Sequence, residues 1–95
     1  MPAESYQRFL ARTGRRIQML RKARGLSQEQ LAERLGMDRV SIGYVEQGRR
    51  SPKLATLYGI AEVLGISVSD ITMGLGPGAE PSPTREYDIA DEPMR

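Results

Sequence analysis

The sequence predicts an all-α protein built as one small domain. Apolar residues recur at spacings of three and four along most of the chain, which is typical of helices that each bury one side. Glycines follow four of these apolar stretches, at the position where a helix commonly ends in a left-handed residue. A chain of 95 residues has room for a single compact core.

The first expected helix runs from about Tyr6 to Arg24, and Gly25 ends it. The residues of its inner side follow one another at spacings of three and four: Leu10, Gly14, Ile17, Leu20 or Arg21, and Arg24. This helix is the longest that the pattern predicts.

Two short helices follow, separated by only three residues. Ser27 and Gln30 form a capping-box pattern at the start of the second helix. Gly36 ends this helix, and its buried face consists of Leu31, Ala32 and Leu35. Asp38 is placed to cap a third helix, Arg39 to Gln47, which the next glycine stops.

A fourth and a fifth helix come after the loop "RRSPK". The fourth ends at Gly65, and its apolar stripe consists of Leu54, Leu57, Ile60, Ala61 and Leu64. Ser67 and Asp70 have the spacing of another capping box, so a short fifth helix begins there. Val68 and Ile71 form its buried side.

The third helix carries residues that its own core does not need. Ile42 and Val45 face inward, whereas a second stripe lies on the outside: Arg39, Val40, Gly43, Tyr44 and Gln47. A solvated face is usually rich in Glu and Lys, and a helical glycine costs about 1 kcal/mol relative to Ala. We interpret the stripe as a reading surface that presses into a groove. The alternative is that Val40 and Tyr44 pack on a neighbouring helix.

Glu46 and Arg21 both lie toward the inner side of their helices. Glu46 is four residues from Ile42, and Arg21 is four residues from Ile17. A partly buried carboxylate is costly unless it is paired, and a bidentate arginine is its usual partner. The spacing predicts an ion pair that fixes the third helix on the first. The alternative is that both side chains extend separately into solvent.

Composition excludes several function classes. The chain has no cysteine and no histidine, so disulfides, zinc fingers, thiol nucleophiles and imidazole chemistry are absent. There is no apolar run of about 18 residues and no signal-peptide core, so we expect a cytoplasmic protein without a membrane partner. No nucleophile and base pair, metal cluster or phosphate loop indicates an enzyme, and we expect no catalytic residue, metal or cofactor.

Charge divides the chain into two parts. Residues 1–75 carry a net charge of +5, and residues 76–95 carry a net charge of −3. The last 22 residues include four prolines and three glycines and have no helical stripe. We expect a basic helical domain over 1–75 and an acidic, flexible tail over 76–95. Tyr87 and Ile89 could dock the tail on a partner protein, and the alternative is a solvated end without a function.

The order of these features resembles a known family. "LSQEQLAERLG", a tight turn and "MDRVSIGYVEQGRRSPKLATLYGIAEVLGISVSDI" look like the Xre family of lambda-repressor-type and Cro-type helix-turn-helix DNA-binding domains, over about Arg15 to Ile71. The resemblance implies a five-helix lambda-repressor-like domain whose second and third helices are the helix-turn-helix. It also implies double-stranded DNA as the partner, with the third helix in the major groove.

The resemblance implies a role for individual residues. The positions that read bases in the family fall on Asp38, Arg39, Val40, Gly43 and Tyr44. The positions that contact phosphates fall on Gln28, Gln47, Arg49, Arg50 and Lys53, and the charge pattern adds Arg12, Arg15 and Arg16. Arg50 lies beyond the end of the third helix, so we expect it to reach only the sugar-phosphate edge.

The ion pair found in many members falls on Arg21 and Glu46. Many relatives carry Gln or Ser where Arg39 and Val40 stand, so known base preferences do not transfer.

We expect a sequence-specific transcriptional regulator of the repressor kind, which binds a palindromic operator as a homodimer and is nucleoid-associated when bound. The dimer surface is expected on the fifth helix and the tail. The apolar residues there exceed what a small core needs: Ile66, Val68, Ile71, Met73 and Leu75.

Two other interpretations stay open. An antitoxin would bind its own operator through the same helices and a toxin through the tail segment "SPTREYDIADEPMR". A helical protein-interaction module without a DNA role would leave the loop of Arg49, Arg50 and Lys53 as an ordinary solvated surface.

Overall fold

The computed structural model describes residues 3–72, which form helices joined by short turns. In chain order the helices are α1 (Ala3–Ala23), α2 (Gln28–Leu35), α3 (Arg39–Glu46), α4 (Leu54–Leu64) and α5 (Val68–Thr72). The predicted all-α class is confirmed over this part of the chain. The helix boundaries agree with the sequence pattern within a residue or two, except that α1 begins at Ala3 and not near Tyr6.

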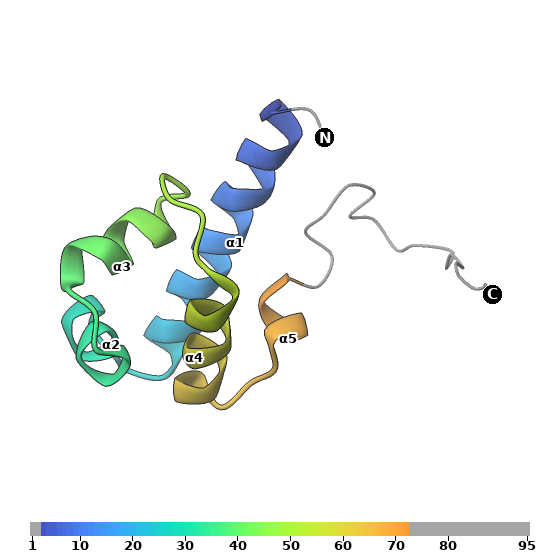
Figure 1. The fold of residues 1–95 in the computed structure, drawn as a ribbon. Coiled ribbons are helices and arrows are strands. Elements are labelled where there is room, and N and C mark those ends of the chain that lie inside the picture. The colour runs from blue at the N-terminus through green and yellow to red at the C-terminus, as the bar shows by residue number, and fades with distance from the viewer. Residues whose placement is uncertain (1–2, 73–95) are drawn as a thin grey trace.

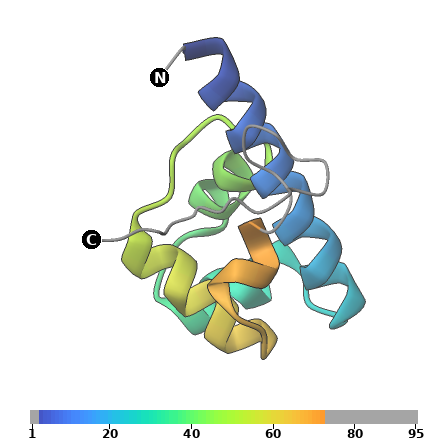
Figure 2. The ribbon, with the colours of Figure 1, turned by 90° about the vertical axis from the view of Figure 1, so that its right-hand side faces the viewer.

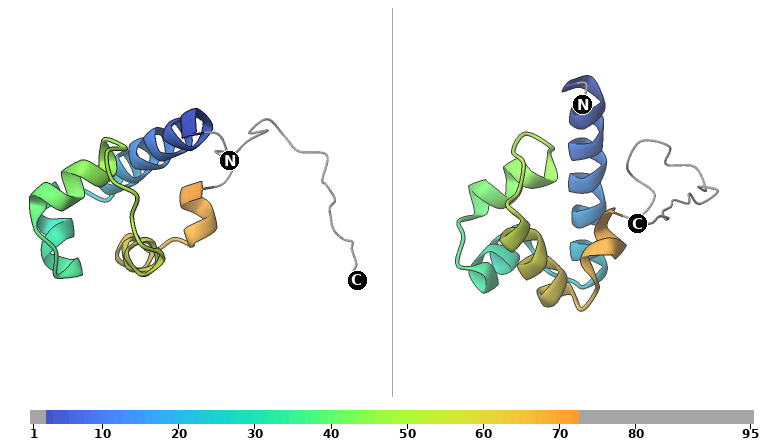
Figure 3. Two further views of the ribbon diagram at one scale, coloured as in Figure 1. Left: turned by 45° about the horizontal axis from the view of Figure 1, so that its top comes forward. Right: turned by 45° about the vertical axis from the view of Figure 1, so that its right-hand side comes forward.

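α1 is the axis on which the other helices assemble. α2 and α3 lie to one side of it, α4 crosses in front, and α5 lies on the other side (Figure 1). α3 packs on both α1 and α2, and α5 packs on both α1 and α4 (Figure 2). The first turns of α1 extend past the rest of the bundle (Figure 3). The outer side of the α2 and α3 pair is therefore left uncovered by the other helices.

Side-chain caps fix where the short helices begin. Ser27 Oγ accepts from the N–H of Gln30 at 3.0 Å, and the N–H of Ser27 donates to Gln30 Oε1 at 2.8 Å. Ser67 and Asp70 repeat this reciprocal pair at 3.1 and 2.9 Å. Both predicted capping boxes are confirmed, and each satisfies amide groups that the first helical turn leaves without a partner.

The core forms two apolar clusters that meet beside α3. The larger one unites four helices through Ile17, Val45, Ile60, Ala61, Leu64 and Ile71. The smaller one joins α2 to α3 through Leu31, Ala32 and Ile42. α3 thus contributes one residue to the larger cluster and one to the smaller, so its inner side is fixed by packing from two directions.

The structure tests two expectations about apolar residues, and the one about Leu54 is wrong. The sequence pattern predicts Leu54 in the buried stripe of α4, but this residue, the first of that helix, is 75% exposed. Of the apolar residues expected to form a dimer surface near α5, Ile71 is fully buried, whereas Ile66 and Val68 are partly buried and pack against the larger cluster. Met73, Leu75 and the tail lie outside the described residues.

Within residues 3–72, no helix is both long enough and apolar enough to span a bilayer.

Candidate nucleic-acid interface

The turn between α2 and α3 is built from local backbone signals. Gly36 ends α2 in the left-handed region, with φ of 68°, which a residue with a Cβ rarely adopts. The N–H of Met37 then donates to the carbonyl of Ala32 at 2.9 Å. Asp38 follows as the cap of α3, so three residues redirect the chain from one helix into the next. This short turn gives α2 and α3 a fixed relative orientation.

A buried polar network holds α3 against α1 and α2. Arg21 Nε donates to Glu46 Oε2 at 2.6 Å and Arg21 Nη2 donates to Glu46 Oε1 at 3.1 Å, so the pair is bidentate. Both side chains are almost inaccessible to solvent. Arg21 Nη1 also donates to the carbonyl of Leu26 at 2.7 Å, and Gln28 Nε2 donates to Glu46 Oε1 at 2.9 Å. The structure contains the ion pair that the spacing predicted, and it adds Gln28 as a third member.

Two glycines allow α1 and α3 to approach closely. A Cβ added at Gly14 would lie 2.3 Å from the carbonyl oxygen of Val45, well inside van der Waals contact. Gly48 has φ of 73°, and a Cβ there would lie 2.7 Å from Cα of Ala11. The sequence pattern placed Gly14 on the inner stripe but gave no sign that a backbone lies against it. The close approach carries the end of α3 directly onto α1.

The outer side of α3 presents fewer residues than the helical spacing suggested. Arg39 and Gln47 are exposed, Val40 is 53% exposed, and Tyr44 is half-buried. The expectation that Gly43 stands on this exposed stripe is wrong, because Gly43 is buried. Its Cα lies beneath the Gln28 side chain, whose Nε2 would be 3.9 Å from an added Cβ. The exposure of Val40 speaks against the alternative in which Val40 and Tyr44 pack on a neighbouring helix, whereas the half-buried Tyr44 does not decide it.

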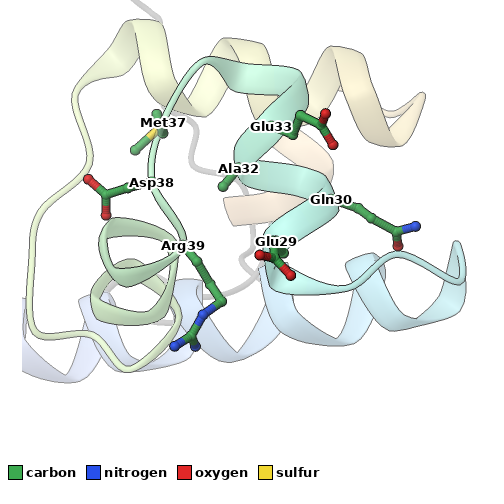
Figure 4. Close-up of a pocket in the computed structure, with 7 residues that line it drawn as sticks. All are labelled: Glu29, Gln30, Ala32, Glu33, Met37, Asp38 and Arg39. Carbon is green, nitrogen blue, oxygen red and sulfur yellow. The ribbon is translucent and has the colours of Figure 1, made fainter.

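Arg39 and Asp38 point in different directions at the start of α3. Figure 4 shows the Arg39 guanidinium turned toward the side where Glu29 lies. Arg39 and Glu29 line one hollow between α2 and α3. The Asp38 carboxylate points away from Arg39 and accepts from the N–H of Ser41 at 2.8 Å. This amide hydrogen bond, with the hydroxyl of Ser41 and the charge of Arg50 as weaker causes, lowers the pKa of Asp38 below its usual value. Asp38 therefore caps α3 as a carboxylate.

The arginines after α3 fold back over it. The guanidinium carbons of Arg49 and Arg50 each lie 5.0 Å from the centre of the Tyr44 ring, within range of a cation–π contact. Arg49 Nη1 donates to Gln47 Oε1 at 3.4 Å, and Arg50 Nη1 donates to Ser41 Oγ at 3.0 Å. Both arginines, which the family resemblance assigns to phosphate contacts, thus add positive charge beside the outer stripe.

The other basic candidates do not all remain exposed. Lys53, Arg12 and Arg15 are exposed. Arg16 instead donates from Nε to the carbonyl of Asp70 at 3.0 Å, so its side chain ties α1 to α5. No group of three or more acidic side chains suited to a metal ion occurs among residues 3–72.

The sequence comparisons agree with this arrangement. The helix-turn-helix family HTH_3 matches residues 17–71, which include α2, α3 and the packing helices α4 and α5. An immunity repressor protein of Bacillus phage phi105 is 41% identical over 81 residues, which cover 81% of this chain and 56% of the repressor. The uncharacterised regulator YazB of Bacillus subtilis is 40% identical over 58 residues, which cover 61% of this chain and 84% of YazB.

The fold of a solved relative agrees as well. The restriction-modification controller protein C.AhdI from Aeromonas hydrophila is 40% identical, with a TM-score of 0.63, over 65% of this chain and 90% of that one. The family match covers more than half of the chain and falls on the helices that carry the turn, the ion pair and the exposed stripe. This chain belongs to the HTH_3 helix-turn-helix family, of the Xre or lambda-repressor type.

Proposed function

We propose that this chain is a sequence-specific DNA-binding transcriptional regulator whose α3 enters the major groove. The observation that carries the proposal is the contrast between the two sides of α3. Its inner side ends in the buried, bidentate Glu46, whereas Arg39 and Val40 stand exposed on its outer side. Base edges are recognised only by side chains held at defined positions, and this network supplies that rigidity. The repressor and regulator names of its relatives point the same way.

The base-reading role belongs to the exposed members of the stripe. Arg39 can donate two hydrogen bonds to guanine O6 and N7, and Val40 can contact the methyl group of a thymine. Tyr44 offers the edge of its ring beside them. Asp38 and Gly43 do not contact bases in this proposal: Asp38 caps the helix, and Gly43 is buried beside the Gln28 side chain.

Phosphate contacts surround this reading surface. Lys53, Arg49 and Gln47 are exposed after α3 and can bind one strand. The N-terminal amides of α2 can bind a phosphate together with Gln28, which keeps its bond to Glu46 or exchanges it for the phosphate. These contacts position the protein without specifying sequence. Because each one releases counterions from the DNA, each makes the affinity fall more steeply as the salt concentration rises.

A homodimer on a palindromic operator completes the proposal. One module of this size buries little surface on DNA, and two copies related by a two-fold axis would contact half-sites about 34–36 Å apart. A dimer doubles the contacts without any change in the site of one copy. We propose repression as the outcome, in keeping with the phage immunity repressor among the relatives.

Selection of bound sequences from random double-stranded DNA tests the proposal. The expected result is one enriched sequence with an inverted repeat at the spacing of one helical turn. Arg39→Ala should relax the preference at one base pair in each half-site. Enrichment of no sequence by the full chain would contradict a reading role for α3 and favour an interaction module without DNA.

A further inference from the structure

Arg50 lies beside the reading surface and not beyond it. Gly48 takes the left-handed conformation at the end of α3, and the N–H of Arg49 donates to the carbonyl of Tyr44 at 2.9 Å. The chain therefore reverses, and the next residue can direct its side chain back along α3. The Arg50 guanidinium carbon lies 5.0 Å from the Tyr44 ring centre.

The guanidinium of Arg50 is also anchored one turn closer to the start of α3. Arg50 Nη1 donates to Ser41 Oγ at 3.0 Å, and Ser41 Oγ donates to Asp38 Oδ2 at 3.3 Å. Ser41 and Tyr44 are three residues apart, so they lie on neighbouring turns of one helix face. A guanidinium carries five N–H donors in a planar fork, and the bond to Ser41 uses one of them.

We infer that Arg50 reads a base edge, as a second specificity-determining residue beside Arg39. This inference rests on the proposed function, since it assumes that α3 lies in the major groove. Ser41 and Tyr44 hold the fork of Arg50 against the helix, where its remaining donors face the same groove as Val40. The matching acceptors are guanine O6 and N7, which a planar fork binds in a bidentate manner.

The alternative role for Arg50 is a phosphate contact. Such a contact needs only a positive charge near the backbone, and a mobile arginine or a lysine supplies it equally well. The stacking on Tyr44 and the bond to Ser41 instead restrict where the guanidinium can point. Restriction of this kind is useful for recognising a base and unnecessary for neutralising a phosphate.

Arg50→Lys separates the two roles, because it keeps the charge and removes the fork. Site selection from random DNA is repeated with the wild type, Arg50→Lys and Arg50→Ala, and each protein is titrated on the selected and scrambled duplexes at several salt concentrations. Lys53→Ala serves as the reference for a lost phosphate contact. Arg34→Ala, which removes a charge from the exposed last turn of α2, is the control for net charge. Thermal melts followed by circular dichroism check that each variant is folded.

We expect Arg50→Lys to lose the preference at one base pair per half-site while its salt dependence stays that of the wild type. Arg50→Ala should bind the selected duplex roughly 10- to 100-fold more weakly, with a much smaller change on scrambled DNA. Ser41→Ala should relax the same base pair more mildly, because it frees the guanidinium.

Two results would overturn the inference. If Arg50→Lys selects the wild-type site, or if Arg50→Ala weakens both duplexes equally as Lys53→Ala should, then Arg50 contacts a phosphate, and the proposed function stands without it. If the wild-type chain selects no site at all, the proposed function fails, and the role of Arg50 fails with it.

Discussion

Glu46 connects three helices through one carboxylate. It accepts two hydrogen bonds from Arg21 on α1 and one from Gln28 at the start of α2. Taking a charge out of water costs several kcal/mol, which the fold recovers only while all of these donors are present. The pair is therefore a weak source of net stability but a strong determinant of where α3 sits. Loss of one partner is far more damaging than loss of both.

Glu46→Ala should lower the free energy of unfolding by about 3 kcal/mol, because the guanidinium of Arg21 is left buried without its counter-charge. Glu33→Ala is the matched control, since Glu33 is exposed on α2. Urea titrations followed by circular dichroism compare the two variants. Small and equal losses of stability would mean that the ion pair is open to water in solution.

Asp38 makes stability depend on pH. Its pKa is lowered chiefly by the hydrogen bond from the N–H of Ser41, so the folded chain favours the carboxylate more than the unfolded chain does. This stabilisation is complete above the ordinary pKa of 3.8 and is lost as the pH falls through the lower folded value. Asp70 behaves in the same way, because the N–H of Ser67 lowers its pKa.

Asp38→Asn should flatten the fall of the melting temperature between about pH 5 and pH 2, because an asparagine caps a helix without titrating. Melts across this range, with the wild type and Asp38→Asn side by side, measure the effect. Asp38→Asn combined with Asp70→Asn should flatten it further. An unchanged pH profile in the double variant would show that other carboxylates control acid unfolding.

At the scale of elements, the crossing of α1 and α3 depends on one missing side chain. Gly14 lies in the middle of α1, where alanine would normally favour the helix. The carbonyl oxygens of Val45 and Glu46 lie 2.3 and 2.5 Å from the place where a Cβ would stand. An alanine there forces the helices apart and disturbs the residue that holds Arg21. Gly43 is the opposite case, since the atom nearest to an added Cβ, Gln28 Nε2, is at an ordinary contact distance of 3.9 Å.

Gly14→Ala and Gly43→Ala should therefore change stability in opposite directions. Gly14→Ala should cost about 1–3 kcal/mol through overpacking, and Gly43→Ala should gain up to about 1 kcal/mol through helix propensity. Thermal melts of the two variants against the wild type give the comparison. If Gly14→Ala has the melting temperature of the wild type, α1 and α3 cross less closely than the structure has them.

The elements themselves could be predicted well because their ends are encoded locally. Ser27 and the glycines after the helices define the boundaries through hydrogen bonds and backbone conformations within a few residues. The helical period also identified the side of α3 that faces the core, and hence the partners Arg21 and Glu46. Resemblance to the family then supplied the topology.

What could not be predicted depends on neighbours distant in sequence. Leu54 lies on the apolar stripe of α4, but whether the first residue of that helix is buried depends on which other elements surround it. Gly43 is covered by a side chain from α2, and Gly14 by the backbone of α3. The return of Arg50 over Tyr44 follows from a left-handed glycine and a tertiary contact together. The pattern of apolar residues within a single helix does not show which other segments contact it.

On the scale of the whole molecule, the chain combines a basic part with an acidic one. The apolar stripes of all five helices precede residue 76, so we propose that residues 1–75 fold as an independent domain and that residues 76–95 form an acidic tail. The acidic stretch lowers the net charge from +5 to +2. Because DNA binding without sequence preference depends on positive charge, the stretch should weaken it by repelling phosphates.

Deletion of residues 76–95 should leave the melting temperature nearly unchanged and raise the affinity for scrambled DNA, most strongly at low salt where charges are least screened. The control keeps the full length but replaces the acidic residues of this stretch by their amides: Glu80, Glu86, Asp88, Asp91 and Glu92. If charge is the cause, this neutralised chain should bind scrambled DNA at least as tightly as the deletion variant does. If deletion raises the affinity for scrambled DNA and neutralisation does not, residues 76–95 weaken DNA binding through their physical presence and not through their charge. Loss of helical circular dichroism on deletion would place part of residues 76–95 in the core.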